Sequence, residues 1–308
     1  MVRPGFAASI VSASLAAIAA ACEAPPSAST SPRLAESAPV LQGSGGAIGT
    51  SPALERAEVA TPPGIAPADA RPLVLLLHGL GDSGAGFERA LGVPTLARDL
   101  HFSFAVPDGT LDRRGRRFWN AGAACCDFDG LAPDHLGQIG SLPDALEKGG
   151  GARFDSVIVV GFSNGAFMAH RLACDVPRVT GIVAIAGAVP GPTDAPCKPT
   201  HPVRTVIIHG DADAVVPYRG GPVLRDASRV VSSAAEAAAT WALHNGCGAL
   251  GAPTRRDLVK KLEGDETRIE AYEGCREPVE LWTVEGADHL DVISRDLVGA
   301  AVKRALGK

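Results

Sequence analysis

Residues 156–169, SVIVVGFSNGAFMA, constrain the fold of this 308-residue chain more than any other segment. A run of β-branched residues ends in Gly161-x-Ser163-x-Gly165, and a helical pattern follows at once. A sharp turn from a buried strand into a helix needs glycines where a side chain would collide, and it lifts the serine hydroxyl clear of the sheet. We therefore predict a strand, a turn and a helix here, with Ser163 as a nucleophile. The alternative is a chance match in a glycine-rich chain.

Short apolar runs alternate with longer helical patterns through the last three quarters of the chain, which is typical of βαβ units. Strands are expected at residues 72–78, 102–106, 156–161, 181–186, 204–209 and 279–284. Helices are expected at residues 86–96, 142–148, 164–174, 228–245 and 291–306. These patterns predict one α/β domain over residues 71–308, with a mostly parallel central sheet flanked by helices.

The first 21 residues have the pattern of a signal peptide: a basic start at Arg3, an apolar alanine-rich run and small residues before Cys22. The run is shorter and less apolar than a membrane-spanning helix requires. Cys22 resembles the lipid-modified cysteine of bacterial lipoproteins, although Ala19 replaces the usual leucine. We expect an exported chain, either secreted or anchored through Cys22. Residues 22–70, rich in proline, serine and glycine, are expected to form a flexible linker.

Composition excludes several classes of protein. The chain has 29 basic and 34 acidic residues, intermixed, with a net charge of -5, which argues against a nucleic-acid partner. Hydrophobic residues make up 46%, enough for a sizeable core. Membrane contact is expected only through the N-terminal anchor, and the oligomeric state stays open.

A serine nucleophile needs a base and an orienting carboxylate, which follow it in the order acid and then histidine. Asp211 and Asp213 come directly after the strand expected at 204–209, and His289 comes after the strand expected at 279–284. Both loops lie where α/β sheets bind their ligands. His289 is the candidate base. The other histidines lie in predicted helices, in loops that no strand precedes, at the end of the first strand or upstream of the acids: His78, His101, His135, His170, His201, His209 and His244.

The segment after the first strand, His78-Gly-Leu-Gly-Asp-Ser-Gly84, formally matches the Gly-x-Gly-x-x-Gly fingerprint of dinucleotide-binding proteins. That fingerprint requires an acid at the end of the next strand, but Asp99 precedes that strand. We therefore expect no nucleotide or other cofactor. The better interpretation is an α/β-hydrolase loop in which the Leu80 N–H, together with the Asn164 N–H, binds the oxyanion of the reaction.

Three motifs together resemble a family of esterases: Gly161-Phe-Ser-Asn-Gly165, His209-Gly-Asp-Ala-Asp213-x-x-Val-Pro217 and Phe118-Trp-Asn-Ala-Gly-Ala-Ala-Cys-Cys126. The family comprises secreted polyhydroxybutyrate depolymerases, feruloyl and acetyl-xylan esterases and related exported esterase lipoproteins, within the α/β-hydrolase superfamily. The resemblance spans about residues 71–290. It implies that Asp213 is the catalytic acid and that the substrate is a polymer or polysaccharide ester.

Two segments depart from that family. His289 is followed by Leu290-Asp291-Val292 instead of Thr-Trp-Pro, and Asp134-His135-Leu136 replaces Asp-Asp-Val. Residues 78–84 are also similar to acyl-protein thioesterases and their carboxylesterase relatives, which are normally cytosolic, so the expected export argues against them. A further alternative is a surface-binding lipoprotein without turnover. The three triad residue types in the correct order favour an enzyme.

Beyond Cys22, the sequence has six cysteines, an even number that in an exported chain predicts disulfides. Cys247 and Cys275 flank the connection between the helix expected at 228–245 and the strand expected at 279–284, so we expect them to pair. The partners of Cys125, Cys126, Cys174 and Cys197 stay open. We expect no metal site, because no Cys-x-x-Cys and no neighbouring histidine set accompany these cysteines.

Trp119 has two interpretations. It is either a core residue or, given its place near the active-site rim of the family it resembles, a substrate-binding platform for a sugar or feruloyl ring. Aromatic residues make up only 5% of the chain, and no long apolar insertion of the kind that forms a lipase lid is present. The sequence therefore predicts an open, shallow site that favours short acyl groups.

Overall fold

The structure is a computed structural model, and it describes residues 59–61, 69–150, 152–189, 191 and 194–308. All of these belong to one compact unit, Gly43–Lys308. The predicted signal peptide at 1–21, the predicted lipid anchor Cys22 and nearly all of the linker at 22–70 lie outside the described residues. Among the described residues, no helix has the length and apolar character needed to cross a bilayer.

A central sheet organises the described part of the chain, with the strand order β10-β11-β12-β7-β6-β5-β1-β2. Its strands are β1 (Ala70–Leu77), β2 (Ser103–Ala105), β5 (Arg153–Phe162), β6 (Val179–Ile185), β7 (Arg204–Gly210), β10 (Thr254–Arg256), β11 (Thr267–Ala271) and β12 (Val279–Val284). The six neighbouring strands β12, β7, β6, β5, β1 and β2 are parallel. At the other edge, β11 pairs antiparallel with β12, and β10 pairs antiparallel with β11. The mostly parallel sheet confirms the predicted fold class.

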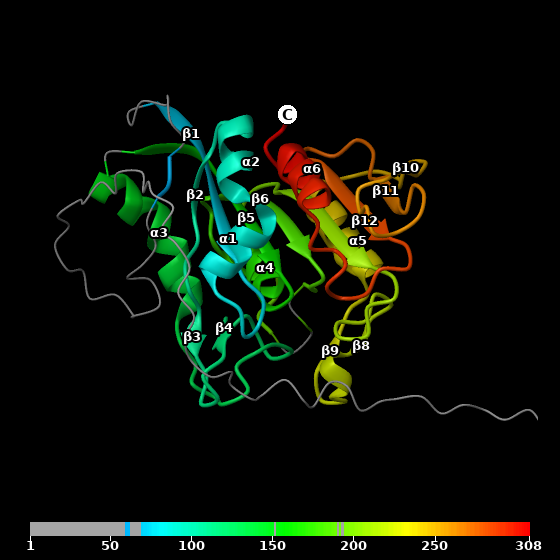
Figure 1. Cartoon of the computed structure of the whole chain (residues 1–308), viewed down its shortest axis with the longest axis horizontal. Helices are drawn as coiled ribbons and strands as arrows, with labels where there is room; N and C mark the ends of the chain where they lie inside the picture. The colour runs from blue at the N-terminus through cyan, green and yellow to red at the C-terminus, as the bar shows by residue number, and fades with distance from the viewer. Residues whose placement is uncertain (1–58, 62–68, 151, 190, 192–193) are drawn as a thin grey trace, which may run out of the picture. The chain divides into compact units, whose positions relative to one another are not determined.

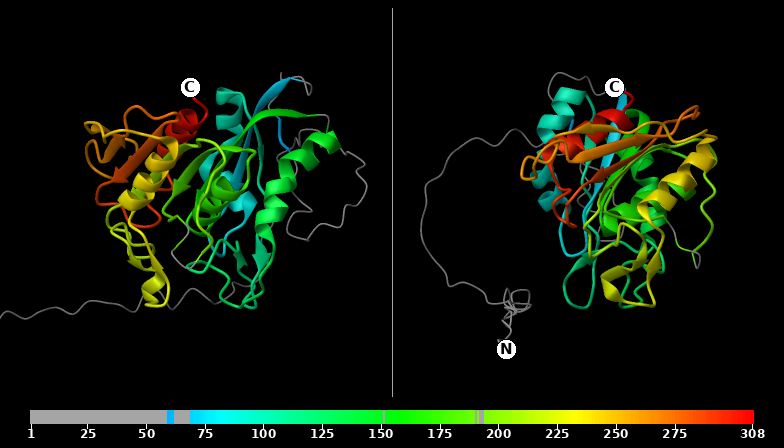
Figure 2. Two further views of the ribbon diagram at one scale, coloured as in Figure 1. Left: turned by 180° about the vertical axis from the view of Figure 1, so that it is seen from behind. Right: turned by 90° about the vertical axis from the view of Figure 1, so that its right-hand side faces the viewer.

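The strands have few polar positions because both faces of the sheet are covered. In β1, Leu73, Leu75 and Leu77 pack into a core shared with α3 (His135–Gly150), α4 (Asn164–Asp175) and α5 (Ala234–Asn245). Val74 and Leu76 face the opposite core, with α1 (Gly84–Leu91), α2 (Val93–Leu100) and α6 (Arg295–Ala305). Figures 1 and 2 show the sheet between these two helical layers.

Several boundaries differ from the sequence-based expectation. The helix expected at 86–96 is two helices, because Gly92 adopts a φ of 62° and ends α1. The helix expected at 228–245 begins only at Ala234, where Ser233 and Glu236 form a capping box. Strands β10 and β11 were not predicted. Apart from the buried Thr267, their residues are exposed or half-buried, and neither strand carries an apolar run.

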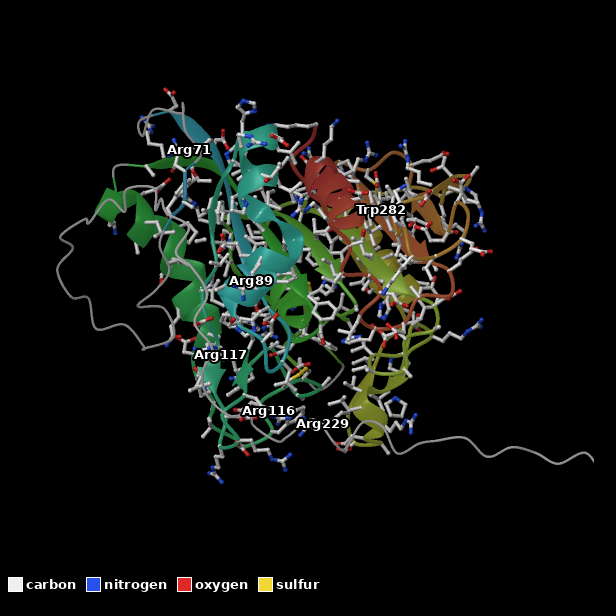
Figure 3. All side chains as sticks on the ribbon, viewed as in Figure 1. Arg71, Arg89, Arg116, Arg117, Arg229 and Trp282 are labelled. Carbon is white, nitrogen blue, oxygen red and sulfur yellow. A yellow bond between two sulfur atoms is a disulfide. The ribbon has the colours of Figure 1, made fainter. Side chains whose placement is uncertain are left out.

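Two small hairpins lie beyond the carboxyl ends of the parallel strands (Figure 1). One pairs β3 (Thr110–Leu111) with β4 (Arg117–Phe118), and the other pairs β8 (Gly221–Pro222) with β9 (Val230–Val231) around the 3₁₀ helix Val223–Arg225. Arg116 and Arg229 lie 5.9 and 4.5 Å from the centre of the Phe128 ring, at the end of the molecule where Figure 3 labels them. These contacts join the 120–131 loop to both hairpins.

The structure contains three disulfides among the described residues. It joins Cys247 to Cys275, the pairing expected from the sequence. It also joins Cys174 to Cys197, and Cys125 to its neighbour Cys126. The Cys174–Cys197 bond joins α4 to the loop after β6, and the Cys247–Cys275 bond joins the segment after α5 to the turn between β11 and β12.

Candidate active site

Ser163 lies in the turn between β5 and α4, with a φ of 51° and a ψ of -117°. Its backbone N–H donates to Ile185 O at 2.8 Å. A Cβ at Gly161 would lie 2.1 Å from Gly165 O, and a Cβ at Gly165 would lie 2.0 Å from Leu77 O. No side chain fits at either distance. The two glycines thus let the helix start close enough to the sheet to present Ser163 at the carboxyl edge.

His289 connects Ser163 to a carboxylate. His289 Nε2 lies 2.9 Å from Ser163 Oγ, and His289 Nδ1 lies 2.7 Å from Asp213 Oδ2. Asp213 follows β7 and His289 follows β12, and these strands are parallel neighbours whose ends meet at the same edge. The structure therefore brings together the three residues that the sequence singled out, across separations of 76 and 126 residues.

Asp211, the alternative acid, and Asp291, two residues after His289, are held by other partners. Asp211 Oδ1 accepts a hydrogen bond from Gly286 N at 2.7 Å. Asp291 forms an ion pair with Lys261 and accepts from Asp288 N at 3.0 Å. Both carboxylates fix loops around the site, so Asp213 is the carboxylate that the geometry assigns to His289.

Asp213 is buried and its two oxygens are fully engaged. Oδ1 accepts from Val215 N and Val216 N, at 2.8 and 2.9 Å, and His209 Nε2 lies 3.3 Å from Oδ2. Burial raises the pKa of the Asp213 carboxyl, but the hydrogen bonds from His209 and His289 and from Val216 outweigh burial and hold that pKa well below its ordinary value. The site thus keeps a carboxylate facing His289.

Sequence reasoning set His209 aside as upstream of the acids, and so missed its place beside Asp213. His209 Nε2 also lies 2.9 Å from Val216 O, so this nitrogen carries the proton and donates. The signal was present in the sequence: a histidine at a strand end, four residues before an aspartate of the next turn.

The predicted oxyanion donors lie on the two segments that border Ser163. Asn164 is the first residue of α4, and a Cβ built on Gly79 would lie 3.6 Å from Ser163 Cβ. Among the described residues, neither Leu80 N nor Asn164 N has a hydrogen-bond acceptor. Two unused N–H groups beside a nucleophile are what stabilisation of an oxyanion requires.

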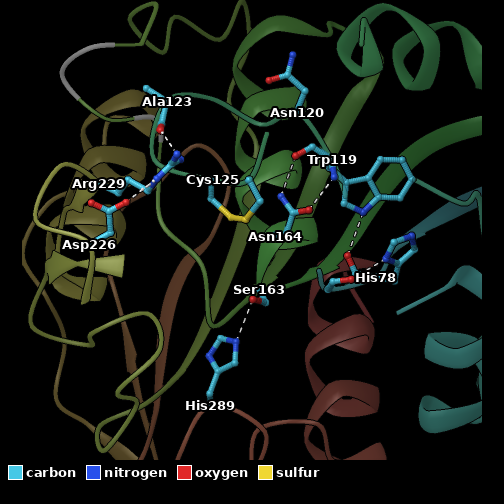
Figure 4. The surroundings of a disulfide bond; sticks show 12 residues. His78, Trp119, Asn120, Ala123, Cys125, Ser163, Asn164, Asp226, Arg229 and His289 are labelled. Atoms are coloured by element: carbon cyan, nitrogen blue, oxygen red, sulfur yellow. Dashed lines mark hydrogen bonds and ion pairs between the residues drawn. A yellow bond between two sulfur atoms is a disulfide. The ribbon is translucent and has the colours of Figure 1, made fainter. Parts of the chain in front are cut away.

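Of the two interpretations of Trp119, its burial supports a core residue and not a substrate platform. Its side chain is 0% exposed, with the ring centre 5.0 Å from His78 and 5.3 Å from His135. Its indole N–H donates to His78 O at 3.0 Å, as Figure 4 shows. The ring lies in the core because its one polar group finds a partner there, so no face is left to stack on a sugar or feruloyl ring.

Phe167, one helical turn after Ser163 in α4, donates its backbone N–H to Ser163 O at 3.1 Å and lines a small recess. Its other lining residues are Ala121, Gly122, Ala124, Cys125, Ala188, Val189, Gly191 and Asp194. A larger hollow of about 470 Å³ continues past Ala121 and Gly122, and its polar lining includes Asn120, Asp134, Arg171 and Asp194.

His135 was expected in a loop, but it is the first residue of α3 and is fully buried. Its Nδ1 accepts from Asn120 N at 2.8 Å, so its Nε2–H donates to Thr110 Oγ1 at 2.9 Å. Burial lowers the pKa of His135 from 6.5 to about 4, against the charges of Asp127 and Asp134, which raise it.

The lowered pKa of His135 predicts an acid-dependent loss of stability. Between pH 6.5 and 4 the unfolded chain binds a proton at His135 that the folded chain does not, so the free energy of unfolding falls as the pH falls. In His135→Gln this contribution is absent. Urea unfolding should show the difference in stability between the wild type and the variant shrinking by about 3 kcal/mol from pH 7 to pH 4. A difference independent of pH would contradict a neutral buried His135.

The chain is similar to known proteins over part of its length. Residues 132–239 match the model of the Phospholipase/Carboxylesterase family, a stretch that includes Ser163 and Asp213 but ends before His289. "Putative esterase NocK" of Nocardia uniformis subsp. tsuyamanensis is 33% identical over 156 residues, which cover 49% of this chain and 43% of that protein. Acyl-protein thioesterase 1 of Saccharomyces cerevisiae is 28% identical over 168 residues, covering 48% of this chain and 73% of the yeast protein. The chain thus spans less than half the length of the Nocardia relative.

Among solved structures, the acetyl xylan esterase from Aspergillus awamori superposes with a TM-score of 0.54 at 16% identity, covering 81% of this chain and 92% of that one. At this identity the likeness shows the fold alone. The chain has the α/β-hydrolase fold, and part of its sequence is similar to the Phospholipase/Carboxylesterase family and to an esterase of Nocardia. These matches agree with the second likeness named in the sequence analysis, to thioesterases and carboxylesterases. The likeness to polyhydroxybutyrate depolymerases stays a prediction.

Proposed function

We propose that this chain is a serine esterase that hydrolyses carboxylic esters through an acyl-enzyme. One observation carries the proposal: a continuous hydrogen-bonded line from Ser163 Oγ through His289 to Asp213, with distances of 2.9 and 2.7 Å. A nucleophile, a base and an orienting carboxylate in contact are the parts that acyl transfer needs. The matches to esterases support the same class of reaction.

In the acylation half, Ser163 Oγ attacks the ester carbonyl carbon while its proton moves to His289 Nε2. The carbonyl oxygen becomes an oxyanion that accepts from Leu80 N–H and Asn164 N–H. Asp213 keeps the Nδ1–H tautomer of His289 and stabilises the imidazolium. The C–O bond to the alcohol then breaks, and the leaving oxygen takes the proton from His289 Nε2, which releases a neutral alcohol.

In the deacylation half, water replaces the alcohol. His289 Nε2 accepts a proton from the water as its oxygen attacks the acyl carbon, and the oxyanion occupies the same two N–H groups. The bond to Ser163 Oγ breaks, the serine oxygen takes the proton back, and the carboxylic acid leaves. The cycle restores every protein group, so it consumes only ester and water.

For the substrate we propose a short acyl group. The support is the sequence, which carries no long apolar insertion of the kind that forms a lipase lid over a long-chain site. Polyhydroxybutyrate, feruloyl and acetyl-xylan esters are the candidate natural targets, and the polar hollow of about 470 Å³ is suited to a polar alcohol portion. The match to the yeast acyl-protein thioesterase favours a second candidate, hydrolysis of acyl-protein thioesters.

Kinetics across a panel of esters test the proposal. We expect kcat/KM for p-nitrophenyl acetate and butyrate to exceed that for palmitate by about 10-fold or more, since each misfitting methylene costs binding. EDTA should have no effect. The panel includes acetyl-xylan, feruloyl esters, hydroxybutyrate oligomers and a palmitoyl thioester.

Each outcome of the panel has a distinct meaning. A preference for long acyl groups, from laurate to palmitate, or for the palmitoyl thioester would favour the second candidate. Loss of activity with EDTA would indicate a metallohydrolase. A binding protein without turnover would hydrolyse nothing and would leave Ser163 unlabelled by a fluorophosphonate.

A further inference from the structure

We propose that Trp119 is a positioning residue that holds the two oxyanion-binding N–H groups, on Leu80 and Asn164, in a fixed relation to each other. The proposal rests on the esterase function above. It concerns a residue that touches neither substrate nor the reacting atoms, because Trp119 is 0% exposed. Its evidence is a set of hydrogen bonds that runs from one side of Ser163 to the other (Figure 4).

The first link joins Trp119 to the residue after the nucleophile. Trp119 N donates to Asn164 Oδ1 at 2.7 Å, and Asn164 Nδ2 donates to Trp119 O at 2.9 Å. The side chain of Asn164 therefore forms a closed pair of hydrogen bonds with the main chain of one residue, and it is itself 0% exposed. This pair leaves the Asn164 backbone N–H free to face the oxyanion.

The second link joins Trp119 to the other donor. Its indole N–H donates to His78 O at 3.0 Å, and His78 Nδ1 lies 2.7 Å from Gly79 O. Gly109 N donates to His78 Nε2, so Nδ1 carries the proton and donates to Gly79 O. In a trans peptide the C=O and N–H point in opposite directions, so fixing Gly79 O also fixes the direction of the Leu80 N–H.

A third contact strengthens the second link. Gly81 N donates to Arg117 O at 2.8 Å, two residues before Trp119 in the chain. The β4 segment thus holds the loop after β1 at His78 O and at Gly81 N, on both sides of Leu80. His78, Trp119 and Asn164 are each 0% exposed, so water does not compete for the hydrogen bonds of their side chains.

A matched pair of variants tests the proposal. Trp119→Phe removes the hydrogen bond to His78 O but keeps an aromatic ring. Trp241→Phe is the control, because Trp241 is also 0% exposed and its indole N–H donates to His170 Nδ1 at 2.9 Å, away from the candidate site. Active sites are first counted with a fluorophosphonate, so that kcat refers to folded, reactive enzyme only.

We expect kcat per active site of Trp119→Phe on p-nitrophenyl acetate to fall about 10- to 100-fold, with KM within about 3-fold, since the lost interaction acts in the transition state. The affinity for a short-chain trifluoromethyl ketone, whose adduct carries an oxyanion, should fall by a similar factor. The acid limb of the pH profile should not move, because the hydrogen bonds of His289 are untouched. Trp241→Phe should keep kcat per site within about 2-fold.

Two results would overturn the inference: full kcat per site in Trp119→Phe, or equal losses in both tryptophan variants. If Trp119→Phe fails to fold, Asn164→Leu decides, since it removes both hydrogen bonds to the Trp119 backbone without adding a charge. It should show the same loss in kcat and ketone affinity, and normal values would refute the inference. A wild-type chain that neither hydrolyses esters nor reacts with the fluorophosphonate refutes the proposed function instead.

Discussion

Ser163→Ala is expected to lower kcat for p-nitrophenyl acetate about 10⁶-fold, the scale of loss when a serine hydrolase loses its nucleophile. His289 Nε2, now 2.9 Å from Ser163 Oγ, then has no hydroxyl to activate. The variant should fold, because alanine fits the same turn and the glycines at 161 and 165 that shape it are unchanged. Circular dichroism and the thermal midpoint check the fold, and initial rates check the loss.

Ser156→Ala is the matched control for that measurement. Ser156 lies on the same strand β5, but its hydroxyl donates to the exposed Asp155 carboxylate at 2.8 Å. It should keep wild-type kcat. If Ser163→Ala retains a tenth of the activity, the nucleophile is another residue and the proposed mechanism is wrong.

Asp213→Asn is expected to lower kcat roughly 10⁴-fold. Asp213 Oδ2 lies 2.7 Å from His289 Nδ1, and a carboxylate there holds the tautomer in which Nε2 accepts the serine proton. Asparagine turns its NH₂ group toward His289 because its Oδ1 still accepts from Val215 N and Val216 N. The imidazole is then left in the wrong tautomer, and its cation loses its counter-charge.

Asp211→Asn provides the comparison, because it makes the same chemical change two residues earlier in the same loop. Asp211 accepts from Gly286 N and does not contact His289, so we expect a loss of less than about 10-fold. Rates for both variants at saturating substrate, with thermal midpoints as a fold check, decide the matter. The reverse ranking would make Asp211 the acid, and small equal losses would place the acid elsewhere, with Asp291 the next candidate.

What could be predicted from the sequence is what neighbouring residues specify among themselves. The strand, turn and helix around Ser163 were predictable because the constraint is local: glycines on either side of one serine, between an apolar run and a helical one. The six parallel strands were predictable for a similar reason. Each is buried on both faces, so its apolar run stands out from the segments around it. The order of serine, acid and histidine along the chain then narrowed the base to His289.

Tertiary structure alone decided everything that depends on which distant segments meet. The motif around residues 209–217 already favoured Asp213 over Asp211, but the contact of Asp213 with His289 depends on the pairing of β7 with β12. The two interpretations of Trp119 could not be separated from the sequence, because its indole N–H has its partner 41 residues away, at His78 O. Sequence periodicity reports whether a residue is apolar, whereas burial and hydrogen bonding depend on what packs against it, and that is set by the strand order of the folded sheet.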